Sequence, residues 1–389
     1  MTLLYCTNTL WAGGGIEHIT ITKANALAAI EGNVVWIAVA DNRFPPVMPL
    51  DNRVRVFDLN LNYYIDDHKR SRLSNLFITL RQIQLHKKKL KELFRTINPD
   101  IVISTDGFGK YFLPRLRTNQ SQAFVREYHM WSKFHRSSPN TLFEKVLCLA
   151  GDFLNTIIIH KYDRVVVLTH EDKNQNWPHN DNVVVLPNPI TITHSFVSSL
   201  EKRIVSAAGR LCHQKNYDLL IDSWLLVHQS HPDWILEIWG DGPDKTRLNK
   251  KISDLQLGQS VFLKGYDKNV LSKLSESSIF VLSSLYEGLP LVIIEALSCG
   301  IPVVATACPC GPKDLIIDGQ NGFLVPVGNK NALAGGICRL IEDSSLRKQM
   351  GGYALEVSKQ YSIERITSRW MDLFDELVTE KGKKLTNKR

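Results

Sequence analysis

The sequence predicts an α/β fold built from two doubly wound domains. Short runs of β-branched and aliphatic residues alternate with longer amphipathic segments, which is typical of βαβ units and a parallel sheet. Several strand-like runs end in glycine-containing turns, as in sheets that bind ligands at the carboxyl ends of their strands. The pattern starts again after Pro187 and Pro189, which disfavour a continued helix or central strand. We therefore predict an N-terminal domain over 1–190, a C-terminal domain over 191–365, and a closing helix with a basic tail over 366–389.

The first domain begins with a core strand at Met1–Tyr5. Further strands are expected where short apolar runs are bounded by polar or turn residues: Val34–Ala40, Val54–Leu59, Ile101–Ser104, Ala123–Glu127, Arg164–Leu168 and Val183–Leu186. The longer amphipathic segments predict helices at Glu17–Ala29, Ser74–Thr96 and Ser138–His160.

The second domain repeats this order. Its strands are expected at Ile204–Ala208, Ile235–Trp239, Val261–Leu263, Ile279–Ser283, Pro302–Ala305 and Phe323–Val325. Helices are expected at Asp218–Gln229, Leu291–Cys299 and Asn331–Glu342. The closing segment Tyr361–Val378 reads as a helix with the apolar anchors Trp370, Leu373 and Phe374, and we expect it to cross back to the N-terminal domain.

Composition excludes several classes of protein. The 389 residues are 44% hydrophobic and 22% charged, values that exclude global disorder and collagen-like structure. The longest apolar stretch, Leu289–Ala307, is broken by prolines, a glycine and a glutamate, so it does not read as a membrane-spanning helix. The N-terminus lacks the positive region of a secretory signal, and the seven cysteines do not form a zinc or disulfide pattern. We expect a cytoplasmic protein.

Positive charge is concentrated in one segment. The net charge is +8, and residues 68–95 hold nine Lys or Arg against one acidic residue. One interpretation is a solvated helix face. The other is a surface attracted to anionic lipid head groups, where each basic residue adds about 1 kcal/mol. The segment lacks the interleaved aromatic residues that stack on bases, so we expect no nucleic-acid partner. Peripheral contact with the inner face of the cytoplasmic membrane stays open beside the solvated helix face.

The stretch from Ser283 to Ala296 carries the most chemical information. It reads as a strand end, a Gly/Pro turn and a helix that begins near Leu291. The N–H groups at such a helix start form an anion site. Glu287 precedes the helix and Glu295 lies just over one turn into it, and each carboxylate can accept strong hydrogen bonds from sugar hydroxyls. The structural alternative is an exposed Glu287 and a capping or salt-bridged Glu295.

This stretch resembles the E-x7-E signature of the retaining glycosyltransferases of family 4. The resemblance covers nearly the whole chain and is densest from Ala208 to Val327. It implies the GT-B fold, two Rossmann-like domains facing across a cleft, and transfer of a sugar from a nucleotide donor with retention. In that family the first Glu contacts the donor sugar and the second the ribose. The donor site assigned by resemblance includes Glu287, Gly288, Leu289, Pro290, Leu291, Val292 and Glu295.

Two further strand ends fit the resemblance. Gly209-Arg210-Leu211 with Lys215-Asn216 is similar to the family's G-R-L…K-N turn, in which Arg and Lys neutralise the donor pyrophosphate. Two cations near a departing diphosphate stabilise the transition state more than the ground state, and the alternative is a surface Arg and Lys that cap a helix. By resemblance, Gly240 and Tyr266 would frame the nucleobase.

At the N-terminus, Gly13-Gly14-Gly15-Ile16-Glu17 resembles the family's G-G-x-E loop. Glycine lets the backbone approach phosphates or sugar closely, so Gly14 and Gly15 are assigned to the donor site. The segment from Gly311 to Asp314 stands where many relatives have a glycine-rich turn followed by Glu. Because Asp is shorter than Glu, no donor contact is assigned to Asp314.

His129 follows a predicted strand of the first domain, in a region where the family often has a histidine. One interpretation is a hydrogen bond to a sugar hydroxyl or help with proton movement, since histidine titrates near neutrality. The other is a buried histidine packed beside Tyr128 and Trp131. We predict as catalytic Glu287, His129, Lys215 and Arg210.

We expect no cofactor and no metal, because Asp66-Asp67 is not a D-x-D motif and the cations with the helix start offset the diphosphate charge. The predicted function is a retaining hexosyltransferase that uses a nucleotide sugar, with UDP favoured, and a saccharide acceptor that is lipid-linked, in surface polysaccharide or lipopolysaccharide synthesis. Front-face displacement is the mechanism that the resemblance implies. The alternatives are a sugar-nucleotide epimerase or phosphorylase on the same scaffold, and a non-catalytic protein that binds nucleotide sugars or nucleic acid.

Overall fold

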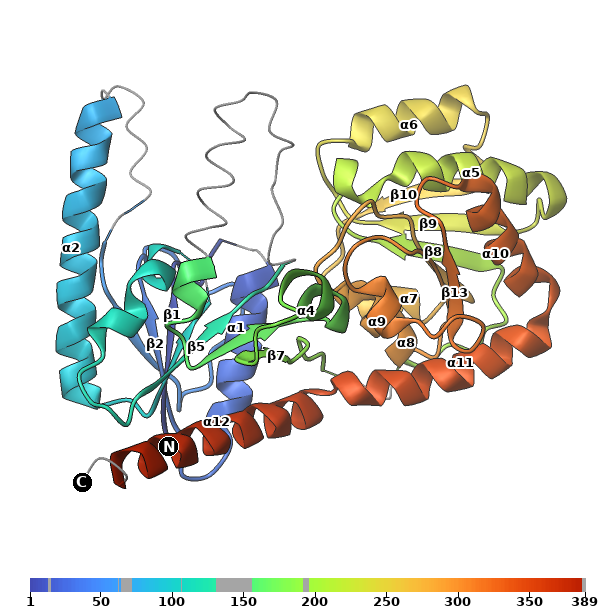
Figure 1. The fold of residues 1–389 in the computed structure, drawn as a ribbon. Helices are drawn as coiled ribbons and strands as arrows, with labels where there is room; N and C mark the ends of the chain where they lie inside the picture. The colour runs from blue at the N-terminus through green and yellow to red at the C-terminus, as the bar shows by residue number, and fades with distance from the viewer. Residues whose placement is uncertain are drawn as a thin grey trace. The chain divides into compact units, whose positions relative to one another are not determined.

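The structure is a computed structural model that describes residues 1–12, 15–61, 63, 72–105, 107–130, 156–191 and 196–386. The chain divides into two compact units, each with its own parallel sheet (Figure 1). Unit 1 contains Met1–Val167, Gln175–Pro189 and Ile366–Arg389, and unit 2 contains Leu168–Asn174 and Ile190–Arg365. The predicted fold class of two doubly wound α/β domains is confirmed.

Unit 1 is built on a seven-stranded parallel sheet in the order β3-β2-β1-β4-β5-β6-β7. Its strands are β1 Thr2–Thr7, β2 Val34–Val39, β3 Arg55–Asp58, β4 Ile101–Ser104, β5 Ala123–Glu127, β6 Arg164–Val167 and β7 Val183–Val185. The strand order reverses between β1 and β4. Most of these strands are apolar runs with both faces buried, as parallel sheets require.

Helices cover both faces of this sheet. On one face, α1 (Gly15–Ala28) and α12 (Ile363–Thr386) pack with the strands into one core. On the other, α2 (Arg72–Ile97) places Leu90, Leu93 and Phe94 against Phe124 and its neighbours. Short 3₁₀ turns follow β4, at Phe108–Tyr111 and Leu113–Leu116. Most of the predicted helix Ser138–His160 lies outside the described residues.

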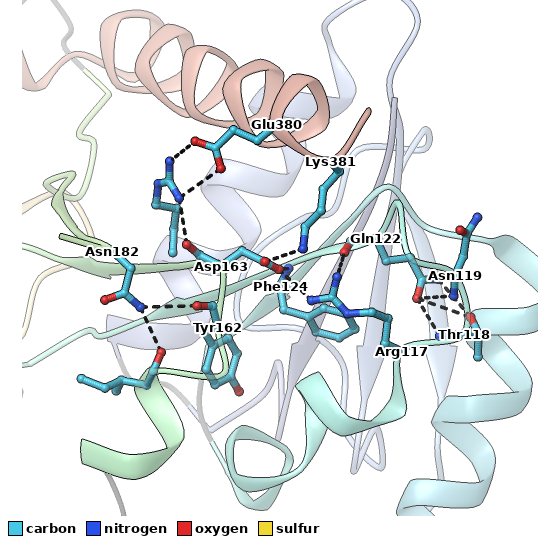
Figure 2. Close-up of polar contacts among 12 residues, drawn as sticks. Arg117, Thr118, Asn119, Gln122, Phe124, Tyr162, Asp163, Asn182, Glu380 and Lys381 are labelled. Carbon is cyan, nitrogen blue, oxygen red and sulfur yellow. Dashed lines mark hydrogen bonds and ion pairs between the residues drawn. The ribbon is translucent and has the colours of Figure 1, made fainter. Parts of the chain in front are cut away.

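The closing helix α12 belongs to the core of unit 1, as predicted. Trp370 is 1% exposed and Phe374 is fully buried among residues of β1, β2 and α1. Near its end, Lys381 binds Asp163, and Arg164 donates to Glu380 at 2.6 Å (Figure 2). These contacts attach the last helix to Asp163, just before β6, and to Arg164, the first residue of β6.

Asp163 is the centre of that attachment. Its carboxylate also accepts from the Phe124 amide at 2.8 Å and from Arg117 at 2.9 Å (Figure 2). Burial pushes the pKa of Asp163 upward, but the hydrogen bonds from Lys381 and Phe124 and the positive charges outweigh burial and lower it. The carboxylate is therefore charged at neutral pH and helps to hold α12 in place.

Unit 2 has a six-stranded parallel sheet in the order β10-β9-β8-β11-β12-β13. Its strands are β8 Ile204–Ala208, β9 Ile235–Trp239, β10 Val261–Gly265, β11 Ile279–Leu282, β12 Val303–Thr306 and β13 Gly322–Val325. The order reverses between β8 and β11, which is the position where doubly wound sheets bind their ligands.

Helices also cover both faces of the second sheet. One face carries α5 (Tyr217–Ser230), α6 (Lys245–Asp254) and α10 (Lys330–Glu342). The other carries α7 (Val270–Leu274), α8 (Leu291–Ser298), α9 (Pro312–Leu315) and α11 (Ser344–Ser358), and a last 3₁₀ turn spans Lys359–Tyr361. The segment His170–Asn176 forms a further short helix, α4. The sequence patterns did not predict α4, α6, α7, α9 or α11.

The structure bears on the predictions about membrane-spanning helices and about the cysteines. No helix within the described ranges is both long enough and apolar enough to span a bilayer. The six cysteines that the structure describes are all free thiols.

Candidate functional site

The carboxyl ends of β8 and β11 carry the predicted donor residues of unit 2. These two strands are neighbours in the sheet, and the strand order reverses between them. The turn after β8 runs through Gly209 and Arg210 to a short 3₁₀ turn, His213–Lys215. The turn after β11 runs from Ser283 to Pro290 and leads into α8. The topology therefore brings the two motifs to one edge of the sheet.

Lys215 and Glu287 meet at this edge. The Lys215 ammonium lies 2.7 Å from Oε1 of Glu287, and the two side chains are 15% and 7% exposed. Ser284 donates to the same Oε1 at 2.6 Å. The main chain at Glu287 is also held in place, since the Glu287 amide donates to the Pro309 carbonyl at 2.7 Å. The alternative of an exposed Glu287 is therefore excluded, and Lys215 contacts a carboxylate rather than a helix end.

The charge of Glu287 affects its buried neighbours. Burial raises the pKa of the Tyr217 hydroxyl, and the Glu287 carboxylate raises it further. The same two causes raise the pKa of the Cys308 thiol to about 12. Both groups are therefore neutral at neutral pH.

Glycines let the turns after β8, β9 and β10 approach closely. A Cβ at Gly240 would lie 2.0 Å from the Gly209 carbonyl oxygen, and one at Gly242 would lie 2.3 Å from that of Leu211. The Gly240 amide donates to the Gly265 carbonyl at 2.8 Å. The predicted Gly240 thus lies directly between the turns that carry Arg210 and Tyr266.

Two predicted side chains at this edge extend into solvent. Tyr266 is 73% exposed. Arg210 is also exposed and, within the described ranges, makes no hydrogen bond or ion pair. An unpaired guanidinium two residues after β8 is available to an anion, whereas Lys215 is already paired with Glu287.

The start of α8 has backbone N–H groups that no side chain caps. The helix begins at Leu291 after Pro290, and no side chain caps it. The first-turn N–H groups, which include those of Leu291 and Val292, have no acceptor within the helix. Gly288 and Leu289 precede them and pack against Gly311, where a Cβ would lie 2.9 Å from the Gly288 carbonyl oxygen and 2.5 Å from Pro290.

Glu295 lies further along α8 and differs from Glu287. In the part of the chain that the structure describes, its carboxylate has no hydrogen-bond or ion-pair partner. Burial raises its pKa above the usual range. The structural alternative of a capping or salt-bridged Glu295 is not observed among the described residues, and a partly buried acceptor remains available for a ligand.

In unit 1, Gly15 begins α1 as the predicted glycine-rich loop requires, and Gly14 lies outside the described residues. His129 follows β5, its side chain is 4% exposed, and Nε2 lies 3.8 Å from Glu127. Among the described residues, neither ring nitrogen has a hydrogen-bond partner. Burial, followed by the charges of Lys23 and Arg126, lowers the pKa of His129 well below its usual value. The imidazole is therefore neutral at neutral pH.

The buried position of His129 does not suit the predicted proton movement. That role needs a pKa near the usual value of histidine, whereas burial lowers the pKa of this ring. Oε1 of Glu127 is itself paired with the buried Lys23, and Oε2 has no hydrogen-bond partner among the described residues. A neutral ring with two unused nitrogens can donate one hydrogen bond and accept another.

Asp314 has a structural contact that sequence reasoning did not find. Its carboxylate accepts the backbone N–H of His170 at 2.5 Å and of Glu171 at 3.3 Å. Lys313 forms an ion pair with Glu171 at 2.8 Å. These bonds attach the start of α4 to unit 2 and use the carboxylate that was not assigned to the donor.

The residues that hold Glu287 were also missed. Ser284 lies three positions before it, and Gln214, which donates to the Tyr286 carbonyl at 2.9 Å, directly precedes Lys215. Their closeness in sequence to the two predicted residues was the available signal. Among the described residues, no group of three or more His, Cys, Asp or Glu side chains is arranged to bind a metal ion.

The chain is similar to known proteins in sequence. Residues 191–357 match the sequence model of the family described as glycosyl transferases group 1. The chain is 28% identical over 362 residues to an uncharacterized glycosyltransferase of Haemophilus influenzae, covering 92% of this chain and 96% of that protein. It is 32% identical over 227 residues to the Campylobacter jejuni N-acetylgalactosamine-N,N'-diacetylbacillosaminyl-diphospho-undecaprenol 4-alpha-N-acetylgalactosaminyltransferase, covering 56% of this chain and 61% of that enzyme.

The fold is also similar to solved structures. A mutant of TarM from Staphylococcus aureus, crystallised with fondaparinux, alpha-GlcNAc-glycerol and UDP, superposes with a TM-score of 0.74 at 19% identity. The match covers 96% of this chain and 99% of that one. At this identity the similarity concerns the fold.

Proposed function

We propose that the chain, whose fold is GT-B and whose residues 191–357 match the sequence model of the group 1 glycosyl transferases, is a retaining hexosyltransferase. The proposed reaction moves a hexose or N-acetylhexosamine from a UDP-sugar to a saccharide acceptor. The observation that carries the proposal is the Lys215–Glu287 pair at the reversal of strand order, beside the uncapped start of α8.

The proposed site for the donor diphosphate lies between β8 and α8. Lys215 has three N–H donors, one of which is directed to Glu287, so two remain for phosphate oxygens. Arg210 adds an exposed and unpaired guanidinium, and the α8 N–H groups add an anion site. As the glycosidic bond breaks, negative charge grows on the diphosphate, and these groups stabilise it most in the transition state.

In this proposal the carboxylates of Glu287 and Glu295 bind different parts of the donor. Glu287, fixed by Lys215 and Ser284, binds a hydroxyl of the transferred sugar. Glu295, which lacks a partner among described residues, binds the ribose hydroxyls. Gly240 and Tyr266 frame the base. The proposed mechanism is front-face displacement without a metal ion. In this mechanism no second carboxylate beside Glu287 acts as a nucleophile.

The proposed acceptor is a lipid-linked saccharide. The Campylobacter relative is named for a diphospho-undecaprenol acceptor, which supports this class. The outer side of α2 adds support, because the exposed Arg81, Lys88 and Arg95 lie on the same helix as Leu80 and Leu85, which are 53% and 38% exposed. Basic side chains next to exposed leucines suit the inner face of an anionic membrane.

The proposal is tested with purified protein and a panel of UDP- and GDP-sugars. Thermal shift identifies the donor, since a ligand that binds the folded state raises the melting temperature. The donor is then incubated with undecaprenyl-diphosphate saccharides, with and without EDTA. We expect transfer with the anomeric configuration of the donor retained, measured by NMR of the product, and unchanged rates in EDTA.

Other outcomes would contradict the proposal. An inverted product would refute retention, and loss of activity in EDTA would refute metal independence. Conversion of the UDP-sugar into its epimer without acceptor would indicate an epimerase. Steeply salt-dependent binding of DNA or RNA with no nucleotide-sugar binding would indicate a nucleic-acid protein.

A further inference from the structure

The two carboxylate oxygens of Glu287 are used unequally. Oε1 accepts from the Lys215 ammonium at 2.7 Å and from the Ser284 hydroxyl at 2.6 Å. In the part of the chain that the structure describes, Oε2 has one contact, at 3.5 Å from the Gln214 amide nitrogen, which is long for a hydrogen bond. Because each carboxylate oxygen can accept about two hydrogen bonds, Oε1 is full and Oε2 keeps unused capacity.

Ser284 is rigidly placed to maintain this asymmetry. Ser284 is fully buried, and its carbonyl oxygen accepts a hydrogen bond from the Thr306 hydroxyl at 2.7 Å. The next amide, that of Leu285, donates to the Gln214 carbonyl at 2.8 Å. These bonds hold the backbone at Ser284 and do not involve the Ser284 hydroxyl. The hydroxyl is therefore free to bind Glu287.

Lys215 alone would not fix the carboxylate to the same degree. An ammonium on a four-carbon stem is a point charge that attracts either oxygen. The Ser284 hydroxyl comes from a short side chain on a fixed backbone, so it selects one oxygen. The combination determines which oxygen carries the two internal bonds.

We infer that Ser284 is a positioning residue that fixes Oε1 of Glu287 and leaves Oε2 as the acceptor for one hydroxyl of the donor sugar. This inference rests on the proposed function and adds how Glu287 is oriented. Ser284 does not touch the donor in this arrangement. It acts through Glu287, so its loss should affect the sugar part of the donor and not the nucleotide part.

The test compares Ser284→Ala with Ser284→Thr, which retains a hydroxyl. The matched control is Ser278→Ala, which removes another fully buried serine hydroxyl, just before the opposite end of β11, where it donates to the Lys202 carbonyl. Calorimetry measures the affinities for UDP and for the intact UDP-sugar, and steady-state kinetics measure kcat and KM. Thermal melts report the stability of each variant.

We expect Ser284→Ala to bind UDP within about twofold of wild type and to lose most of the extra affinity conferred by the sugar. Its kcat should fall by about tenfold or more, the effect of losing one hydrogen bond to a charged group. Ser284→Thr should recover a large part of kcat, and Ser278→Ala should retain wild-type rates even where it lowers the melting temperature.

The inference is overturned if Ser284→Ala keeps the wild-type kcat and sugar-dependent affinity, or if its affinities for UDP and UDP-sugar fall together. Failure of the proposed function gives a different result. In that case the wild-type chain transfers no sugar, while the difference between UDP and UDP-sugar binding still shows whether Ser284 orients Glu287. A wild-type chain that binds no nucleotide sugar overturns both.

Discussion

Lys215 and Glu287 depend on each other for their burial. With 15% and 7% of the side chains exposed, removing either one leaves a charge largely without water and without a partner. Breaking such a pair is more damaging than replacing both members by neutral groups of similar size. Loss of catalysis and loss of stability must therefore be separated at this position.

We expect Glu287→Gln and Lys215→Met each to lower turnover by about 100-fold or more, because each removes charge that acts in the transition state. The double variant Lys215→Met/Glu287→Gln should be as inactive but closer to wild type in melting temperature than Lys215→Met alone. Initial rates at saturating donor and circular dichroism melts measure the two effects. Near-normal rates in these variants would show that the site is assigned wrongly.

Glu295 gives a prediction with a pH dependence. Burial raises its pKa in the folded chain, so the charged carboxylate costs stability at neutral pH. Glu295→Gln should raise the melting temperature of the ligand-free protein at neutral pH. The gain should disappear as the pH falls below about 4.3, where the carboxyl is protonated in both folded and unfolded chains.

The same variant should bind UDP more weakly, because an amide is a poorer acceptor for two ribose hydroxyls than a carboxylate. Calorimetry measures this loss. Glu364→Gln, at an exposed position on α12, is the control and should change neither property. A ligand-free stability unchanged by Glu295→Gln at neutral pH would contradict the role of burial.

At the residue scale, Lys215 and Glu287 are predicted by motifs that resemble those of the glycosyltransferases of family 4. The two residues meet because both follow strands, and parallel strands end at one edge of the sheet. The contacts of Asp314 with α4 and the buried surroundings of His129 could not be predicted. They depend on segments far apart in the chain, such as His170 with Asp314 and Lys23 with Glu127.

At the scale of elements, strands were easier to predict than helices. All thirteen described strands overlap predicted ones, and most of them are the continuous apolar runs of buried parallel strands. Two missed helices show why the others were difficult. Half of the residues of α6 are charged, and it buries only Leu248 and Ile252. α11 contains Gly351, a poor helix former, which is needed because a Cβ there would lie 2.5 Å from the Gly300 carbonyl oxygen.

The attachment of α12 gives a prediction about stability. Trp370 is 1% exposed in the core of unit 1, with the Lys23 ammonium 4.8 Å from its ring centre. We expect Trp370→Ala to cost about 3–5 kcal/mol, as truncation of a large buried aromatic does. Urea unfolding followed by circular dichroism measures this loss.

The control is Val378→Ala on the same helix, where the side chain is 38% exposed. It should cost little, since surface substitutions usually change stability by less than about 0.5 kcal/mol. Equal effects of the two variants would show that α12 does not complete the core of unit 1.

At the scale of the whole molecule, the net charge of +8 is less informative than its local concentration on α2. We expect the protein to float with anionic vesicles and to stay behind with neutral ones. The double variant Lys88→Glu/Arg95→Glu should lose most of this binding, because each basic residue near an anionic surface contributes about 1 kcal/mol.

The control is Lys250→Glu/Lys330→Glu, which lowers the net charge by the same amount at exposed positions of unit 2. It should float as the wild type does. If both double variants lost binding equally, attraction by total charge would explain the result and α2 would have no special role. Equal flotation of the wild type with neutral and anionic vesicles would remove the membrane proposal.

The passage of the chain between the units has a consequence for biosynthesis. Unit 1 begins at Met1, but the helix that closes one face of its sheet is drawn from Ile366–Arg389. While the ribosome is still translating unit 2, the nascent unit 1 lacks Trp370 and Phe374 and leaves apolar side chains uncovered. This face of the unit 1 sheet can therefore be covered only after the segment from Ile366 onward has been synthesised.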